Sequence, residues 1–166
     1  MLEGCKLAGL EGIIVTVGTT PFDSLIRALD SEALELPIHF QIGNGSYLPS
    51  SGPWFRFKRN LFEHYRTKRW LVVTHAGAGS IYSLLESGAV PLALPNFERI
   101  DNHQKELATY IEHNTFGKVC WNTVDIGAAV ESYLKEDPAS FRSYERKSVG
   151  LPDDLLDAIL GVDLEP

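Results

Sequence analysis

A histidine followed by small residues is the part of this sequence best suited to chemistry. His75 is followed by Gly77, Ala78, Gly79 and Ser80, and apolar residues at helical spacing come directly afterwards. A glycine-rich loop that leads into a helix presents unpaired backbone N–H groups and a partial positive charge, so it can bind an anion such as a phosphate. The same residues also form ordinary turns and helix caps, so this loop alone does not decide between the two interpretations.

A second loop of small residues lies near the start of the chain. Gly18, Thr19 and Thr20 follow an apolar stretch and precede Pro21, a residue that favours the first turn of a helix. The threonines can offer hydroxyl and amide groups to the same anion, or they can cap the following helix. Two such loops together favour a phosphate ligand more strongly than either loop alone.

Strand-like and helix-like stretches alternate along the chain. Apolar stretches, uncharged and β-branched at 13–17 and 70–74, predict strands at residues 13–17, 38–42, 54–57, 70–74, 90–94 and 118–121. Helical spacing predicts helices that begin near Pro21, Asn60, Ile81, Asp101 or Asn102, and Asp125, with the asparagines and Asp101 as candidate caps. This order predicts an α/β fold with a Rossmann-like parallel sheet and helices on both faces. Both loops follow strands, so both should open onto the edge of the sheet where such folds bind ligands.

The length and composition are those of one globular domain. The chain has 166 residues, 44% hydrophobic and 22% charged, and we expect a lead-in at 1–12, one domain at 13–166 and terminal helices from about residue 138. The net charge of −7 argues against a protein that wraps duplex nucleic acid. A local basic cluster can be a solvated helix surface or a site for lipid or polymer, and it consists of Lys58, Arg59, Arg66, Lys68 and Arg69.

Cysteine usage and hydropathy bear on the compartment. Cys5 and Cys120 are far apart and in no metal-binding spacing, which fits a reducing compartment without disulfides. No apolar stretch reaches the roughly 18 residues that span a bilayer, and the first residues lack the pattern of a secretory signal. We therefore expect a cytoplasmic protein without a membrane span of its own, whose membrane association comes through a partner.

Three segments form a recognisable pattern when taken together. They are Val15–Asp23 (VTVGTTPFD), Thr74–Ile81 (THAGAGSI), and Asp101–Gln104 (DNHQ) followed by Glu106–Ala108 (ELA). In order and approximate spacing they resemble the Alg13-like and PssE-like half of the GT-B glycosyltransferases, a glycosyltransferase family 28 C-terminal domain related to the donor-binding domain of MurG. The resemblance covers about residues 13–135.

The resemblance implies a domain that binds a nucleotide sugar, usually linked to UDP. It would place the diphosphate at Gly18, Thr19, Thr20, His75, Gly77, Ala78, Gly79 and Ser80, and the sugar at Asn102, His103 and Gln104. The chain has no Asp-x-Asp motif. We therefore expect no metal or other cofactor, and fixed backbone dipoles would stabilise the leaving group in place of a cation.

The sequence departs from the family pattern at the nucleoside end. The family commonly has an acid eight residues after the loop histidine, where it contacts the ribose hydroxyls, but this chain has Ser83 there. The nearest acid, Glu86, lies about 4.5 Å further along a helix and is a weaker candidate. One extra residue also separates Gly88 from Pro91.

The activity that the resemblance implies needs a second protein. This chain would be the catalytic, donor-binding subunit of an inverting hexosyltransferase that moves N-acetylglucosamine or another hexose from a UDP-sugar to a lipid-linked acceptor in glycan or polysaccharide, including exopolysaccharide, biosynthesis. A complete GT-B enzyme has two such domains. In the family the other half is a membrane-anchored Alg14-like or PssD-like subunit, which would recruit this one to the cytoplasmic membrane face.

The general base and the activity itself have alternatives. His75 and His103 are the candidates within the chain, because imidazoles titrate near neutral pH, and the partner can supply the base instead. Ser83 motivates a second hypothesis, a non-catalytic subunit that binds the nucleotide sugar or stabilises the complex. A third hypothesis is a phosphate-binding α/β protein of other function.

Overall fold

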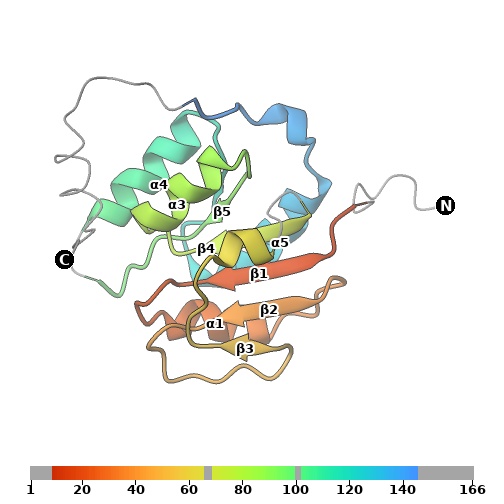
Figure 1. Ribbon diagram of the computed structural model, residues 1–166, viewed down its shortest axis with the longest axis vertical. Coiled ribbons are helices and arrows are strands. Elements are labelled where there is room, and N and C mark those ends of the chain that lie inside the picture. Colours follow the sequence, from red (N-terminus) through yellow and green to blue (C-terminus); the bar gives the residue numbers. More distant parts are fainter. Residues whose placement is uncertain (1–8, 66–68, 100–101, 146–166) are drawn as a thin grey trace.

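The fold is organised around one parallel sheet. The computed structural model describes residues 9–65, 69–99 and 102–145. The strands are β1 (Gly12–Thr16), β2 (Ile38–Gln41), β3 (Trp54–Phe55), β4 (Trp70–Thr74), β5 (Leu92–Ala93) and β6 (Lys118–Val119). All neighbouring pairs are parallel, and the order across the sheet is β3-β2-β1-β4-β5-β6 (Figure 1). This is the Rossmann order, so the predicted fold class is confirmed.

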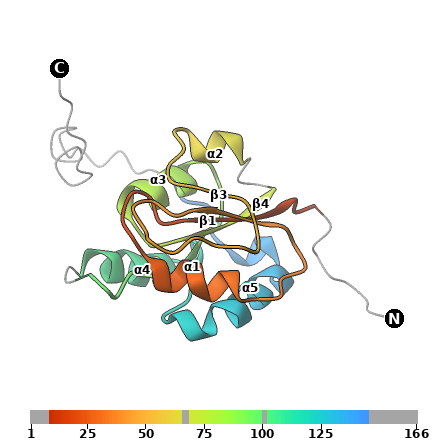
Figure 2. The ribbon, with the colours of Figure 1, turned by 90° about the horizontal axis from the view of Figure 1, so that it is seen from below.

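Helices cover both faces of the sheet, as predicted. They are α1 (Asp23–Asp30), α2 (Leu61–His64), α3 (Ala78–Glu86), α4 (His103–His113) and α5 (Ile126–Lys135). Figure 2 shows α2 and α3 on one side of the sheet and α1 and α5 on the other. The helix α4 packs against α3, because Ala108 and Ile111 share a buried cluster with Ile81 and Leu85.

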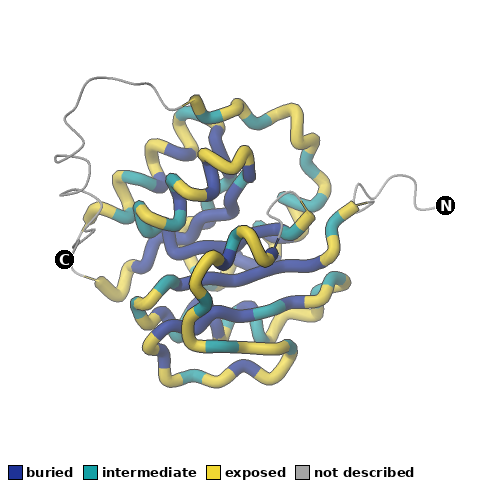
Figure 3. Tube along the Cα trace, viewed as in Figure 1, coloured by how far each residue is buried: buried dark blue, intermediate teal, exposed yellow. Residues whose placement is uncertain are grey.

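The central strand β1 explains why both faces need a cover. Ile13 and Val15 lie in the cluster that α1 and α5 complete, whereas Ile14 joins Leu61 of α2 and Leu84 of α3. All five residues of β1 are buried (Figure 3). A strand that is buried on both faces reads as a continuous apolar run, which is why its position was predictable from the sequence.

The strands are mostly shorter than the sequence predicted. β1 begins one residue before the expected boundary at residue 13, β2 ends at Gln41, and β3 ends at Phe55. β5 has only two residues, and Pro91 lies before it because a proline has no N–H to donate to the ladder. The apolar residues at the predicted strand ends, such as Ile42 and Leu94, are buried in loops.

The predicted caps lie close to the helix starts but make no capping hydrogen bonds, and the candidate cap Asp101 lies outside the described residues. Phe22 occupies the cap position of α1, so Pro21 precedes the helix and no threonine caps it. Asn60 has a left-handed backbone with φ of 55° and makes no side-chain cap, and Asn102 stands at the cap position of α4 without a side-chain bond. The backbone amides at these helix starts are therefore left for other partners.

Two further helix boundaries differ from the prediction. The helix α3 begins at Ala78, three residues before Ile81, so the small residues belong to its first turn. A 3-10 turn at Thr123–Asp125 precedes α5, and the Asn122 side chain accepts a hydrogen bond from the Asp125 amide at 2.9 Å.

The predicted terminal helices fall largely outside the described residues. Pro138–Ser140 form a 3-10 turn, residues 141–145 are not helical, and the remainder of the predicted segment, 146–160, is not described.

Asp30 is one of two carboxylates, with Asp23, that anchor the long connection after β2. Asp30, the last residue of α1, accepts hydrogen bonds from the Tyr47 hydroxyl at 2.5 Å and from the Ser50 and Ser51 amides at 2.8 and 2.7 Å. Burial raises the pKa of Asp30, but these hydrogen bonds outweigh it and lower the pKa from 3.8 to about 2. The ionised carboxylate therefore stabilises the folded state.

We expect Asp30→Asn to lower the free energy of unfolding by about 1–2 kcal/mol at neutral pH, because it weakens charge-assisted hydrogen bonds. Because the folded-state pKa lies below that of the unfolded chain, this stabilisation is complete above about pH 4 and is lost as the pH falls toward 2. Urea unfolding across this range measures the difference between the two proteins. Glu35→Gln, a change at an exposed carboxylate, is the control, and a gap that does not narrow in acid would contradict the prediction.

Candidate functional site

The two small-residue loops meet at the carboxyl ends of the central strands. β1 and β4 are neighbours, and Thr16 pairs with Thr74 at their ends. The chain then turns through residues 17–22 after β1 and residues 75–77 after β4. The strand order reverses direction between these two strands, and a Rossmann sheet binds its ligand at this point.

The glycines beside His75 make room for its ring. A Cβ on Gly77 would lie 2.3 Å from His75 Nε2, and a Cβ on Gly18 would lie 3.3 Å from His75 Cε1. Gly77 itself has an ordinary φ of −71°, and Ala76 takes the left-handed conformation with φ of 57°. The imidazole therefore packs between the two loops and fixes their separation.

The His75 imidazole is buried without a full set of partners. The residue is 7% exposed, and its Nδ1 atom, like the Thr74 hydroxyl, makes no hydrogen bond within the described part of the chain. Burial lowers the pKa of His75, the Thr16 backbone opposes this shift, and the positive charge of Arg99 lowers the pKa further. The ring is therefore held neutral at physiological pH. Buried polar atoms usually have a partner, so these two mark a place where a ligand or a ligand-bound water would complete the site.

The first turn of α3 offers backbone donors next to this histidine. No side chain caps the helix, and the first backbone bond of the turn runs from the Ile81 amide to the Gly77 carbonyl at 2.9 Å. The amides of Ala78, Gly79 and Ser80 thus lack partners within the helix. A Cβ on Gly79 would meet nothing within 4 Å, so the space beside this turn is open.

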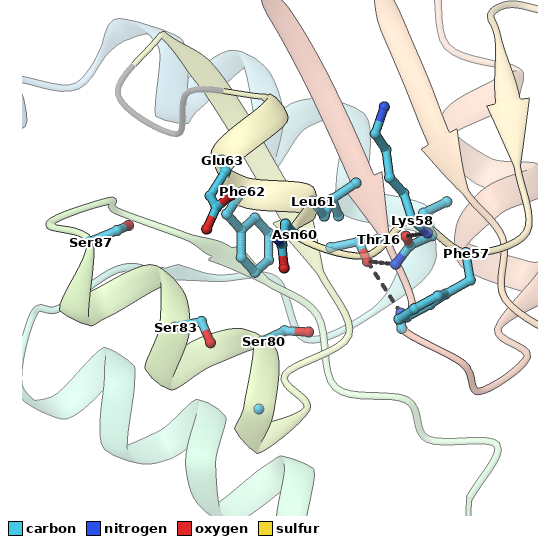
Figure 4. Close-up of a pocket in the computed structure, with 13 residues that line it drawn as sticks. Thr16, Phe57, Lys58, Asn60, Leu61, Phe62, Glu63, Ser80, Ser83 and Ser87 are labelled. Atoms are coloured by element: carbon cyan, nitrogen blue, oxygen red, sulfur yellow. Dashed lines mark hydrogen bonds between the residues drawn. The ribbon is translucent and has the colours of Figure 1, made fainter.

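A cavity of about 480 Å³ opens between α2 and α3 (Figure 4). It is lined by Thr16, Gly18, Gln41, Phe57, Lys58, Asn60, Leu61, Phe62, Glu63, Gly79, Ser80, Ser83 and Ser87. One wall is formed by the serines of α3, and the other by α2 and the residues that precede it. The volume and the mixture of apolar and polar lining suit a small-molecule ligand.

Buried hydrogen bonds hold the floor of the cavity. Thr16 Oγ1 accepts from the Gly18 amide at 3.2 Å and from Gln41 Nε2 at 2.8 Å, while Gln41 Oε1 accepts from the Lys58 amide at 2.8 Å. Gln41 is 3% exposed. This single amide side chain therefore ties the loop after β1 to the segment that leads into α2.

A third loop joins the site through Asn96. Its Nδ2 donates to the Pro21 carbonyl at 3.1 Å, and its backbone amide donates to Gln104 Oε1 at 2.9 Å. Arg99 Nη1 donates to Thr20 Oγ1 at 3.2 Å. The loop after β1, the loop after β5 and the start of α4 are therefore connected to one another.

The structure places some of the predicted site residues in the lining of the cavity and others outside it. Gly18, Gly79 and Ser80 line it, and so does Ser83, where an acid was expected. Those that do not line it are Thr19, Thr20, His75, Gly77, Ala78, Asn102, His103, Gln104 and the weaker candidate Glu86. The His103 side chain is 89% exposed, 3.8 Å from the Glu106 carboxylate.

Several residues of the site were not predicted from the sequence. They are Thr16, Gln41, Phe57, Lys58, Asn60, Leu61, Phe62, Glu63 and Ser87 at the cavity, and Asn96 and Arg99 at the third loop. A polar residue at the end of an apolar strand was a usable signal for Gln41. The residues of the α2 wall gave no such signal, because only the fold brings that segment opposite α3.

No metal centre or membrane span is found in the part of the chain that the structure describes. Within residues 9–65, 69–99 and 102–145, no group of three or more His, Cys, Asp or Glu side chains could hold a metal ion. No helix there is long and apolar enough to cross a bilayer. Cys120 is a buried free thiol, and Cys5 lies outside the described residues.

Known proteins resemble this chain in sequence. The chain is 35% identical over 114 residues to the UDP-N-acetylglucosamine transferase subunit ALG13 of Homo sapiens, a match that covers 60% of this chain and 10% of that protein. It is 26% identical over 135 residues to the protein of the same name from Yarrowia lipolytica (strain CLIB 122 / E 150), covering 69% and 67%. The chain thus spans only about a tenth of the length of its human relative.

The solved structures and the family comparison agree with this relationship. The glycosyltransferase SnogD from Streptomyces nogalater superposes with a TM-score of 0.59 at 16% identity, over 80% of this chain and 36% of that one. This likeness establishes the shared fold, that of a single GT-B half-domain. Residues 12–147 match the glycosyltransferase family 28 C-terminal domain, and the chain therefore belongs to this family.

Proposed function

We propose that this chain is the donor-binding subunit of an inverting glycosyltransferase and that it binds a UDP-sugar. The observation that carries the proposal is the cavity beside the first turn of α3, at the point where the strand order of the sheet reverses. It combines open space with amides that have no partner within the helix, and the buried His75 lies in the adjoining loop between β4 and α3. The family to which the chain belongs, and relatives named as UDP-N-acetylglucosamine transferase subunits, support the same ligand.

The diphosphate is assigned to the start of α3. The amides of Gly79 and Ser80 lie at the positive end of the helix dipole, which favours a negatively charged group. The Ser80 hydroxyl lines the same cavity, and Gly18 faces it from the loop after β1. The His75 ring packs against Gly18 and Gly77 of the two loops, and its Nδ1 atom has no partner among the described residues.

The uracil is assigned to the aromatic side of the cavity. Phe57 and Phe62 both line it, and Phe57 is 58% exposed. An aromatic ring left exposed at a cavity mouth is suited to stacking on a planar base.

The sugar is assigned to the start of α4. Asn102 and His103 are exposed there, and Gln104 uses Oε1 to hold the third loop, which leaves its Nε2 group to donate a hydrogen bond to a sugar hydroxyl. Gln104 would then position the loop and contact the ligand with the same amide group.

In the transfer step the acceptor oxygen bonds to the anomeric carbon as the bond from that carbon to the diphosphate breaks. The configuration inverts, the acceptor proton passes to a general base, and UDP leaves. Negative charge grows on the leaving diphosphate, and the amides at α3 stabilise it without a metal ion. Neither His75, which is buried, nor His103, which lies outside the cavity, is well placed as the base.

The acceptor side belongs to a second subunit in this proposal. A membrane-anchored Alg14-like or PssD-like protein would bind the lipid-linked acceptor, supply the base and hold this chain at the cytoplasmic membrane face. N-acetylglucosamine is the first sugar to test, because the relatives carry it in their names. Ser83 in the cavity motivates the second candidate, a subunit that binds the nucleotide sugar without catalysing transfer.

We expect calorimetry to show UDP binding by the wild-type chain, and at least about tenfold weaker binding by His75→Ala, because the two phosphate loops lose the ring that separates them. His113→Ala, at the exposed end of α4, should bind UDP as the wild type does. Thermal unfolding shows whether the variant is folded. Equal UDP affinity in a folded His75→Ala protein would contradict the site assignment.

We expect Gly79→Ala to separate stability from binding. A methyl group there meets no protein atom and replaces a helical glycine, so the melting temperature should stay constant or rise. The same methyl group stands where the phosphate approaches, so the affinity for UDP should fall by about tenfold or more. Glu131→Ala on α5, on the opposite face of the sheet, is the control, because it also places an alanine in a helix but far from the proposed phosphate site. An unchanged affinity would place the diphosphate elsewhere.

We expect sugar transfer only when this chain is combined with its partner. A suitable assay adds UDP-N-acetylglucosamine and a lipid-linked acceptor to the chain alone, to an Alg14-like or PssD-like subunit alone, and to both. Turnover in the pair supports the catalytic proposal. Binding without turnover in a reconstituted pair would favour the non-catalytic subunit.

A further inference from the structure

The cavity has an uneven distribution of charge. Glu63 of α2 is the one carboxylate among the described residues that line it. Its carboxylate makes no hydrogen bond or ion pair with another residue of the described ranges. Figure 4 shows Glu63 on the wall opposite Ser80, Ser83 and Ser87, while the Lys58 ammonium points away from those serines. The cavity is therefore lined by a carboxylate that no described residue pairs with.

The serines of α3 give a scale along the cavity. Ser83 lies about 4.5 Å beyond Ser80 along the helix axis, and Ser87, directly after the end of α3, lies about 10 Å beyond Ser80. If the diphosphate lies at the first turn, one of its two phosphates points along α3. The group bonded to that phosphate then lies opposite Ser83 and beyond. In a nucleoside diphosphate that group is the ribose.

Electrostatics restrict which part of the ligand can lie beside Glu63. A carboxylate only accepts hydrogen bonds, and it is repelled by a diphosphate. It needs a neutral group with hydroxyl donors, which the 2′ and 3′ hydroxyls of a ribose provide. In dinucleotide-binding Rossmann folds an acid makes this contact from a strand end, so the interaction does not depend on one position in the fold.

We propose that Glu63 binds the ribose hydroxyls of the nucleotide, so that the α2 wall supplies the carboxylate that the α3 wall lacks at Ser83. The proposal rests on the proposed function, because it takes a nucleoside diphosphate as the ligand. Glu63 is a specificity-determining residue in this scheme. It makes the cavity selective for ribonucleotides.

The experiment measures the affinities of UDP and 2′-deoxy-UDP by calorimetry for the wild-type chain and for Glu63→Gln. A hydrogen bond to a charged group contributes about 10- to 100-fold in affinity. The wild type should prefer UDP by at least about tenfold, and Glu63→Gln should bind the two ligands within about threefold of each other. Glu63 is exposed, so the variant should keep the wild-type melting temperature.

Glu131→Gln is the matched control. It removes a carboxylate that is 69% exposed on α5, across the sheet from the cavity, and it should keep the wild-type preference for UDP. A preference that survives in Glu63→Gln, or that is absent from a wild-type chain that binds UDP, would overturn the role of Glu63 and leave the proposed function standing.

N3-methyl-UDP distinguishes the ribose from the base. If Glu63→Gln loses discrimination against N3-methyl-UDP and keeps it against 2′-deoxy-UDP, Glu63 contacts the uracil and the ribose assignment is wrong. A wild-type chain that binds no UDP would overturn the proposed function and, with it, this inference.

Discussion

The contact on which the site depends is the packing of the His75 ring between two glycines. The ring reaches Gly77 within its own loop and Gly18 in the loop after β1, and either methyl group would press on it. Because β1 and β4 are paired in register up to Thr16 and Thr74, the sheet sets how close the loops come. The imidazole then fills the remaining space. Its lowered pKa follows from this placement, since a charged ring would have to give up its hydration.

Side chains with more than one partner extend this arrangement outward. Gln41 ties the loop after β1 to the segment before α2, and Asn96 ties that loop to the loop after β5. Gln104 adds the start of α4. All these elements leave the same edge of the sheet, so a few buried amide groups are enough to position loops that are far apart in the sequence. The candidate site therefore depends on hydrogen bonds between its loops as well as on the residues that line the cavity.

The sheet and the α3 wall of the cavity could be predicted from the sequence. The α2 wall could not. Continuous apolar runs such as Ile13–Val17 report burial directly, and the residues from His75 to Ser80 carry a local signature of helix entry. Glu63 and Phe57 carry no such signature. They lie in a short helix and its approach, and they face α3 only because the chain crosses over the sheet between β3 and β4. The capping hydrogen bonds were not predictable either, since Asn60 and Asn102 occupy the cap positions of α2 and α4 but their side chains make no such bond.

The two walls of the cavity differ in how many of their residues are buried in the core. This difference affects how the sequences of relatives can change. The helix α3 has nine residues, of which Ile81, Leu84 and Leu85 are buried, so most changes to its course disturb the core. The helix α2 has four residues and buries Leu61 alone. Natural variation can therefore remodel the α2 wall with less loss of stability than the α3 wall. In the function that we propose, nucleotide preference and phosphate binding can then vary independently within one small domain.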